Sequence, residues 1–182
     1  MIRTTGFVGL PNHAAVNRYE PIELLMSEHA GLRVYFRHLR DLNSDYFFEI
    51  DDFILGCHAK VEDEVIFPAL RKVGGSETQK IDKTTRKLEE EHKLVEMLSS
   101  NMKQAVVEGT KALDSAKVAL YASTVESHND SEEIFVFKFW NDIDKETRAA
   151  STEEVKRIIG EFGTARYLRL TGFSQEFLSL LA

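Results

Sequence analysis

Hydrophobic residues recur at the three- and four-residue spacing of a helix along four stretches of this chain. The stretches run from about residue 22 to 42, 45 to 73, 77 to 108 and 110 to 140, and each carries one apolar face. The residues that we expect to point inward are Leu25, Leu32 and Phe36; Ile54, Val61, Val65 and Ala69; Leu88, Val95 and Met102; and Tyr121, Val125, Phe135 and Phe139. The short connections favour antiparallel neighbours. The pattern therefore predicts an all-α fold, an up-down-up-down four-helix bundle with short C-terminal helices.

Polar and glycine-containing breaks separate the four stretches. Ser44 or Asp45 is the expected cap of the second stretch. Glycines at positions 74–75 end that stretch, and Gly109 ends the third. Pro68 lies inside the second stretch, where its missing N–H and its ring predict a kink.

The two ends of the chain differ from this pattern. Residues 1–19 show no periodicity, which predicts an N-terminal arm before a bundle of residues 20–141. Residues 142–182 are expected to form a C-terminal helical extension packed on the bundle. Within it, Ser-Thr-Glu-Glu at 151–154 is a capping-box pattern that predicts a helix start, and a shorter amphipathic piece follows. Such helices usually cover a bundle end, and their surface is also a candidate contact for a homodimer.

Composition supports a folded protein and excludes several functions. The 182 residues are 43% hydrophobic with twelve Phe, enough for a core, and the net charge of -7 argues against nucleic-acid binding. No stretch approaches the roughly 18 apolar residues of a membrane span. The N-terminus lacks the apolar run of a signal peptide, and Cys57, the only cysteine, cannot form an internal disulfide. We therefore expect a cytoplasmic protein that binds neither nucleic acid nor membranes.

Two of the helical stretches carry the same pair of polar residues on their inward faces. His58 and Glu62 form one His-x-x-x-Glu pattern, and His128 and Glu132 form the other. Positions i and i+4 of a helix lie on one face, about 5–6 Å apart, so an imidazole nitrogen and a carboxylate can point at one spot.

The other two stretches each contribute one inward histidine in a matching context. His29 follows Glu28, His92 follows Glu91, and a hydrophobic residue stands three positions after each histidine. The first half of the bundle thus resembles the second. We interpret this as an internal duplication with a pseudo-twofold axis through the site.

These six residues predict a site for two metal ions. A lone inward histidine is more often a packed core residue, but two pairs and two further histidines on the remaining helices are hard to obtain by chance. An ionised glutamate in an apolar core costs several kcal/mol unless it is paired, and no inward Lys or Arg is evident. Iron, zinc and manganese all accept such ligands. In two six-coordinate ions, four imidazoles, two bridging carboxylates and an oxide or hydroxide bridge leave about one open position on each ion for a small molecule.

The chain resembles the hemerythrin-like, HHE cation-binding family over about residues 20 to 140. The residues that carry the resemblance are SEHAGLR around His29, HAKVEDEVIFPAL from His58, EEH ending at His92, and HNDSEEIF from His128. The resemblance implies a non-heme centre of two iron ions, oxo- or hydroxo-bridged. Glu62 and Glu132 would be the bridging carboxylates, and the four histidines the terminal ligands.

The chain also departs from the oxygen-carrying hemerythrins, which have a His-x-x-x-His pair on the third helix. Here the third stretch reads His92-Lys-Leu-Val-Glu96, so Glu96 is either a replacement ligand or a surface carboxylate. No Glu-x-x-His pattern of ferritin-like proteins occurs among the six residues. The smaller histidine set favours binding of O2, NO or peroxide in sensing or stress response. The alternatives are a di-iron enzyme that disproportionates peroxide, and an iron-storage or donation protein for iron-centre repair.

Overall fold

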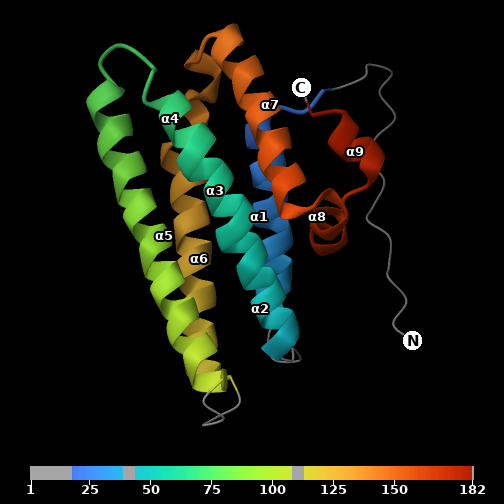
Figure 1. Cartoon of the computed structure of the whole chain (residues 1–182). Helices are drawn as coiled ribbons and strands as arrows, with labels where there is room; N and C mark the ends of the chain where they lie inside the picture. The colour runs from blue at the N-terminus through green and yellow to red at the C-terminus, as the bar shows by residue number, and fades with distance from the viewer. Residues whose placement is uncertain (1–17, 39–43, 108–112, 182) are drawn as a thin grey trace.

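The protein is mostly helical in the part of the chain that its computed structural model describes, residues 18–38, 44–107 and 113–181. No β-strand occurs in those ranges, where a single bridge pairs Tyr19 with Leu181. The helices outside the second stretch are α1 (Pro21–Arg37), α5 (Thr78–Val107), α6 (Ser115–Phe135), α7 (Lys145–Phe162), α8 (Thr164–Thr171) and α9 (Gln175–Ser179). Figure 1 shows a helical bundle, with α7 lying along one side of it and α8 and α9 beyond. Within the described ranges, no helix is long and apolar enough to cross a membrane.

The second stretch forms one continuous helical run that widens into a π turn twice. It consists of α2 (Ser44–Phe53), a π turn (Ile54–His58), α3 (Ala59–Val61), a second π turn (Glu62–Ile66) and α4 (Phe67–Leu70). The Phe67 N–H bonds to the Glu62 carbonyl five residues back. The chain therefore stays helical through Pro68, and the local adjustment beside the proline is this wider turn. Such turns occur often at functional sites.

Most of the expected inward residues are buried, but the end of the fourth stretch is a correction. The fourth helix ends at Phe135 rather than near Trp140, because the backbone of Val136 leaves helical geometry and residues Phe137–Asp142 form a 3-10 helix. Val136 and Phe137 are buried, whereas Phe135, predicted to point inward, is 48% exposed. Phe139 is only partly buried. Counting from Glu132, helical spacing allows either Phe135 at i+3 or Val136 at i+4 to point inward. The packing of the core selects Val136.

Other expected boundaries shift or lie outside the described residues. The first helix ends at Arg37 rather than near 42, and α6 begins at Ser115, where the Asp114 side chain accepts a hydrogen bond from the Ala116 N–H. The predicted stop at Gly109, most of the predicted N-terminal arm, and capping by the side chains of Ser44 or Asp45 lie outside the described part of the chain.

The C-terminal extension begins earlier than its capping pattern suggested. Asp144 caps α7 by accepting the Thr147 N–H, so Ser151 and Thr152 lie inside the helix and are buried. Their hydroxyls donate to carbonyls four residues back, the usual alternative for hydroxyl side chains within a helix. Helix α7 contacts α1, α3, α4 and both π turns, so it lies along the bundle and not over its end.

A glycine turn then returns the chain toward α2. Gly163 has φ of +100°, a conformation that residues with a Cβ rarely adopt, and α8 starts directly after it. Arg169 donates to Glu49 at 2.9 Å and Arg166 to Asp52 at 3.1 Å, so α8 is held against α2 on both sides of Tyr167. Tyr167 itself is fully buried.

Candidate metal centre

Four helical segments converge on one buried cluster of polar side chains. His29 lies on α1, His58 and Glu62 lie in the two π turns, His92 lies on α5, and His128 and Glu132 lie on α6. All six residues are buried, with at most 8% of their surface exposed. The structure therefore brings together the six residues that the sequence predicted as the metal site. Their six ring and carboxylate groups form two overlapping groups of four.

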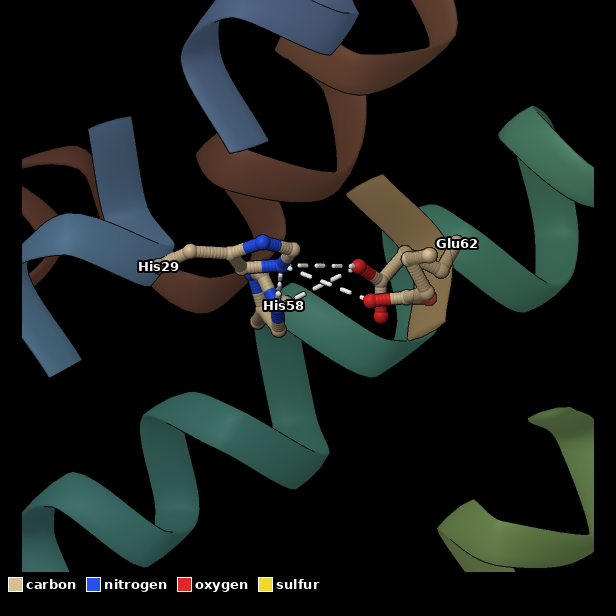
Figure 2. Close-up of side chains that lie close together, drawn as sticks. His29, His58 and Glu62 are labelled. Carbon is tan, nitrogen blue, oxygen red and sulfur yellow. Dashed lines mark hydrogen bonds and ion pairs between the residues drawn. The ribbon is translucent and has the colours of Figure 1, made fainter. Parts of the chain in front are cut away.

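The first group combines His29, His58 and the two glutamates. The Nε2 atoms of the two histidines lie 3.1 Å apart, and His58 Nε2 lies 3.2 Å from Glu62 Oε1. His29 Nε2 lies 3.4 Å from Glu132 Oε2. Figure 2 shows the rings of His29 and His58 turned toward the Glu62 carboxylate. Two imidazole nitrogens and two carboxylate oxygens thus surround one point.

The second group repeats this arrangement with the other oxygen of each glutamate. His92 Nε2 lies 3.2 Å from Glu62 Oε2, and His128 Nε2 lies 3.3 Å from Glu132 Oε1. Each carboxylate therefore directs one oxygen to each group. This division of oxygens is the arrangement that two bridging carboxylates require, and it follows the twofold repetition in the sequence.

A carboxylate outside the cluster holds each of the four imidazoles by its other nitrogen. The Nδ1–oxygen distances are 2.9 Å from His29 to Glu133, 2.6 Å from His58 to Glu28, 2.9 Å from His92 to Asp63, and 3.0 Å from His128 to Glu91. Because Nδ1 faces a carboxylate, it carries the proton and donates. In the neutral imidazole, Nε2 then presents its lone pair to the cluster, as a metal ligand must.

These outer carboxylates were not singled out from the sequence, although a signal for them exists. Each is the chain neighbour of a cluster residue: Glu28 precedes His29, Asp63 follows Glu62, Glu91 precedes His92, and Glu133 follows Glu132. A helix brings neighbouring residues to adjacent faces, so one of them can point into the cluster while the other supports a ligand on the next helix. The recurrence of an acidic residue next to a cluster residue on each helical stretch is the sequence signal that could have identified these outer carboxylates.

Without a metal, protons balance part of the charge of the cluster. Burial alone would lower the pKa of the His29 imidazole, but the close Glu133 and Glu62 carboxylates outweigh it and raise that pKa to about 9. Nearby carboxylates also outweigh burial at His92 and His128, whose pKa values rise to about 10 and about 9. These imidazoles are therefore cations near neutral pH in the metal-free protein.

The pKa values of the two buried glutamates shift in opposite directions. Burial acts to raise the pKa of the Glu62 carboxyl, but the imidazoles of His58, His29 and His92 hold that pKa well below its usual range. Burial and then the Glu62 charge raise the pKa of the Glu132 carboxyl. The imidazoles therefore stabilise the charge of the Glu62 carboxylate more than that of Glu132.

The donor set fits metal ions. Two ligand atoms bonded to one ion at about 2.1 Å and about 90–110° to each other lie roughly 3.0–3.4 Å apart, which matches the 3.1–3.4 Å between the donor pairs given above. Both oxygens of Glu62, both oxygens of Glu132 and Nε2 of His128 are buried without a hydrogen bond from the described residues. Buried polar atoms are normally paired, so these atoms are the ones that a bound cation would satisfy.

The other potential ligands of the chain lie outside the cluster or outside the described residues. Glu96 is exposed, and of the two histidines without a partner at ligand spacing, His38 is exposed and His13 lies outside the described residues. Cys57 is a buried thiol whose pKa burial raises strongly. The exposure of Glu96 favours the interpretation as a surface carboxylate.

Comparison with known families identified one match. The family described as the hemerythrin HHE cation binding domain matches residues 20–139. Searches of curated proteins and of solved structures gave no significant match.

Proposed function

This chain belongs to the hemerythrin HHE cation-binding family, and on that premise we propose that it binds two iron ions and responds to a small ligand in sensing or stress response. The ligand is O2, NO or peroxide. His29 and His58 would hold one ion, His92 and His128 the other, and Glu62 and Glu132 would bridge them. The helices that carry these residues would form the up-down-up-down four-helix bundle of the family.

The observation that carries this proposal is the division of the glutamate oxygens. Glu62 Oε1 lies beside His58 and Glu62 Oε2 beside His92. In the same way, Glu132 Oε2 lies beside His29 and Glu132 Oε1 beside His128. A single ion would use only one group and leave the other imidazoles facing unpaired oxygens. Two ions satisfy both groups.

Room for a small ligand follows from the count of protein donors. Each group supplies two imidazole nitrogens and two carboxylate oxygens, which leaves about two positions on a six-coordinate ion for a bridge and for an external ligand. Iron would supply electron transfer and direct coordination of that ligand. The protein's part is to exclude bulk water and to hold the ligand atoms on four rigid helical segments.

Metal content and the visible spectrum test the proposal directly. We expect two iron ions per chain by elemental analysis, and a new charge-transfer band when azide, a small anionic probe, is added to the oxidised protein. Zinc-loaded protein is the control, because it has the same fold and no such band. A chain that binds one zinc ion and no iron would contradict the proposal. Rapid consumption of excess peroxide would indicate the enzyme alternative instead.

Asn129 is a further residue that we expect to act on the small ligand. It is fully buried, and neither its amide nitrogen nor its oxygen has a hydrogen-bond partner among the described residues. It lies three residues before Glu132 and four before Glu133, so it shares the face of α6 that approaches the cluster and α1. An unpaired buried amide costs about 1–3 kcal/mol, which a hydrogen bond to a bound ligand would offset.

The variant Asn129→Leu should separate ligand binding from metal binding. We expect azide affinity to fall by about tenfold, the loss of one hydrogen bond, while two ions stay bound. The free energy of unfolding of the metal-free protein should rise, because the unpaired amide is gone. Ser131→Ala, which removes a hydroxyl that donates to the Ser127 carbonyl, is the control. Unchanged azide affinity in Asn129→Leu would exclude this role.

A further inference from the structure

One of the four outer carboxylates differs from the rest in its surroundings. Glu28, which holds His58, is only 5% exposed. Its counterpart in the repeated half of the cluster is Glu91, which holds His128 and has a side chain 24% exposed. Glu91 is paired with the surface amine of Lys87 at 3.0 Å. The similarity between the two halves of the cluster therefore does not extend to the surroundings of Glu28 and Glu91.

The partner of Glu28 comes from the C-terminal extension. The Tyr167 hydroxyl on α8 donates a hydrogen bond to Glu28 Oε1, and Glu28 Oε2 accepts the His58 Nδ1 proton at 2.6 Å. Tyr167 is fully buried and lies beyond residue 139, where the match to the family ends. A chain of hydrogen bonds thus runs from α8 to a residue of the metal cluster.

We propose that Tyr167 is a positioning residue for the metal centre and makes its two halves unequal. This inference rests on the proposed two-metal function. Tyr167 fixes the orientation of Glu28, and Glu28 fixes the ring and tautomer of His58. A buried carboxylate acts on its imidazole more strongly than a partly hydrated one that is also neutralised by a lysine. The ion held by His29 and His58 therefore binds more tightly than the ion held by His92 and His128.

The ring packing of Tyr167 supports a fixed geometry. Its ring centroid lies 6.0 Å from that of Phe53, which lies 6.1 Å from the His58 ring. Removing the hydroxyl alone would keep these contacts and leave Glu28 Oε1 buried without its donor. Changes to groups that orient metal ligands typically weaken metal binding by about 10–100-fold.

The test compares Tyr167→Phe with two matched controls, using cobalt(II) as the probe metal in the full chain. Tyr121→Phe also removes a fully buried hydroxyl that donates to a fully buried carboxylate, Asp51, but among the described residues no hydrogen bond or ion pair joins this pair to the four imidazoles. Lys87→Met removes the partner of Glu91, which is the counterpart of Tyr167 in the other half of the cluster. In calorimetric titrations we expect two ions in every variant, with one of them bound at least tenfold more weakly in Tyr167→Phe only.

Proton NMR of the cobalt(II) protein gives a signature that a purely structural role would not produce. The Nδ1 protons of the four imidazoles should appear as separate, strongly shifted signals. In Tyr167→Phe one of them, that of His58, should move, and the other three should stay in place. In the unmutated protein this proton should exchange with D2O most slowly, because Glu28 and Tyr167 cover it, and this measurement needs no variant.

A double-mutant cycle tests whether Tyr167 acts through Glu28. Glu28→Gln should weaken the same ion, and adding Tyr167→Phe to it should weaken that ion no further. The inference is overturned if Tyr167→Phe and Tyr121→Phe change both affinities equally, if no His signal moves, or if all four signals exchange at one rate. Fewer than two cobalt ions in the unmutated chain would instead refute the proposed function, and the inference with it.

Discussion

Replacing Glu62 with alanine should remove both metal ions from the chain. The two oxygens of this carboxylate serve different groups: Oε1 lies 3.2 Å from His58 Nε2, and Oε2 lies 3.2 Å from His92 Nε2. Loss of the side chain therefore removes one donor from each ion, together with the negative charge that the two ions share. Glu132→Ala should have the same result for the same reason.

A histidine variant provides the contrast, because each imidazole belongs to one group only. His92→Ala should release the ion that it shares with His128 and retain the other, so one ion per chain remains after dialysis. Glu96→Ala is the control, since Glu96 is exposed, and it should keep both ions. The measurement is metal per chain by elemental analysis. Two ions still bound in Glu62→Ala would show that Glu62 is not a bridging ligand.

Chelation of the metal should lower the melting temperature by about 10–20 °C. At a free metal concentration about 100-fold above Kd, each ion stabilises the folded state by about 2.7 kcal/mol. A change of 1 kcal/mol shifts the melting temperature of a chain of this size by about 2–4 °C. The measurement is calorimetry before and after chelation, followed by re-addition of metal. A melting temperature that chelation leaves unchanged would contradict a metal site in the core.

The metal-free protein should also lose stability as the pH rises from about 6.5 to about 10. The folded-state pKa values of His29, His92 and His128 are raised to about 9, about 10 and about 9, above the ordinary histidine value of 6.5. A raised histidine pKa contributes stability that is fully present below the unfolded value. That contribution is lost as the imidazole deprotonates in the folded state, because two buried glutamates then lose their neutralising charges.

Urea unfolding of the metal-free protein at several pH values measures this dependence. The free energy of unfolding should fall steadily between pH 6.5 and pH 10. The metal-loaded protein is the control and should change little over the lower part of this range, because the ions replace the protons. A metal-free protein whose stability rises over this range would show that the imidazoles are not held as cations.

The six cluster residues could be predicted because their signal is local. A His-x-x-x-Glu spacing places both side chains on one helix face whatever the helix packs against. The apolar periodicity says which face points inward, so His58, Glu62, His128 and Glu132 were fixed to the core before any tertiary contact was known. The repetition of Glu-His in the other two stretches then identified His29 and His92.

The helix boundaries that were predicted wrongly are those where the local sequence permits two helix ends. Ser-Thr-Glu-Glu at 151–154 is a good helix start, but Asp144 caps the same helix earlier, and the hydroxyls bond within the helix instead. At the end of α6, Phe135 and Val136 are both hydrophobic, and the packing of Val136 and Phe137 into the core chooses between them. The two π turns could not be predicted from residue types, because they depend on how the second helical stretch packs against the neighbouring helices.

The sequence alone determined the helical class, most of the inward positions and the six residues of the cluster, because helix periodicity is a short-range property of the chain. Only the tertiary structure decided that Glu62 and Glu132 each direct one oxygen to each pair of histidines, since this division depends on how four segments pack. Contacts between residues far apart in the chain likewise decided the partners of the imidazoles. The contact from Tyr167 to Glu28 spans 139 positions of sequence, and no local pattern can encode it.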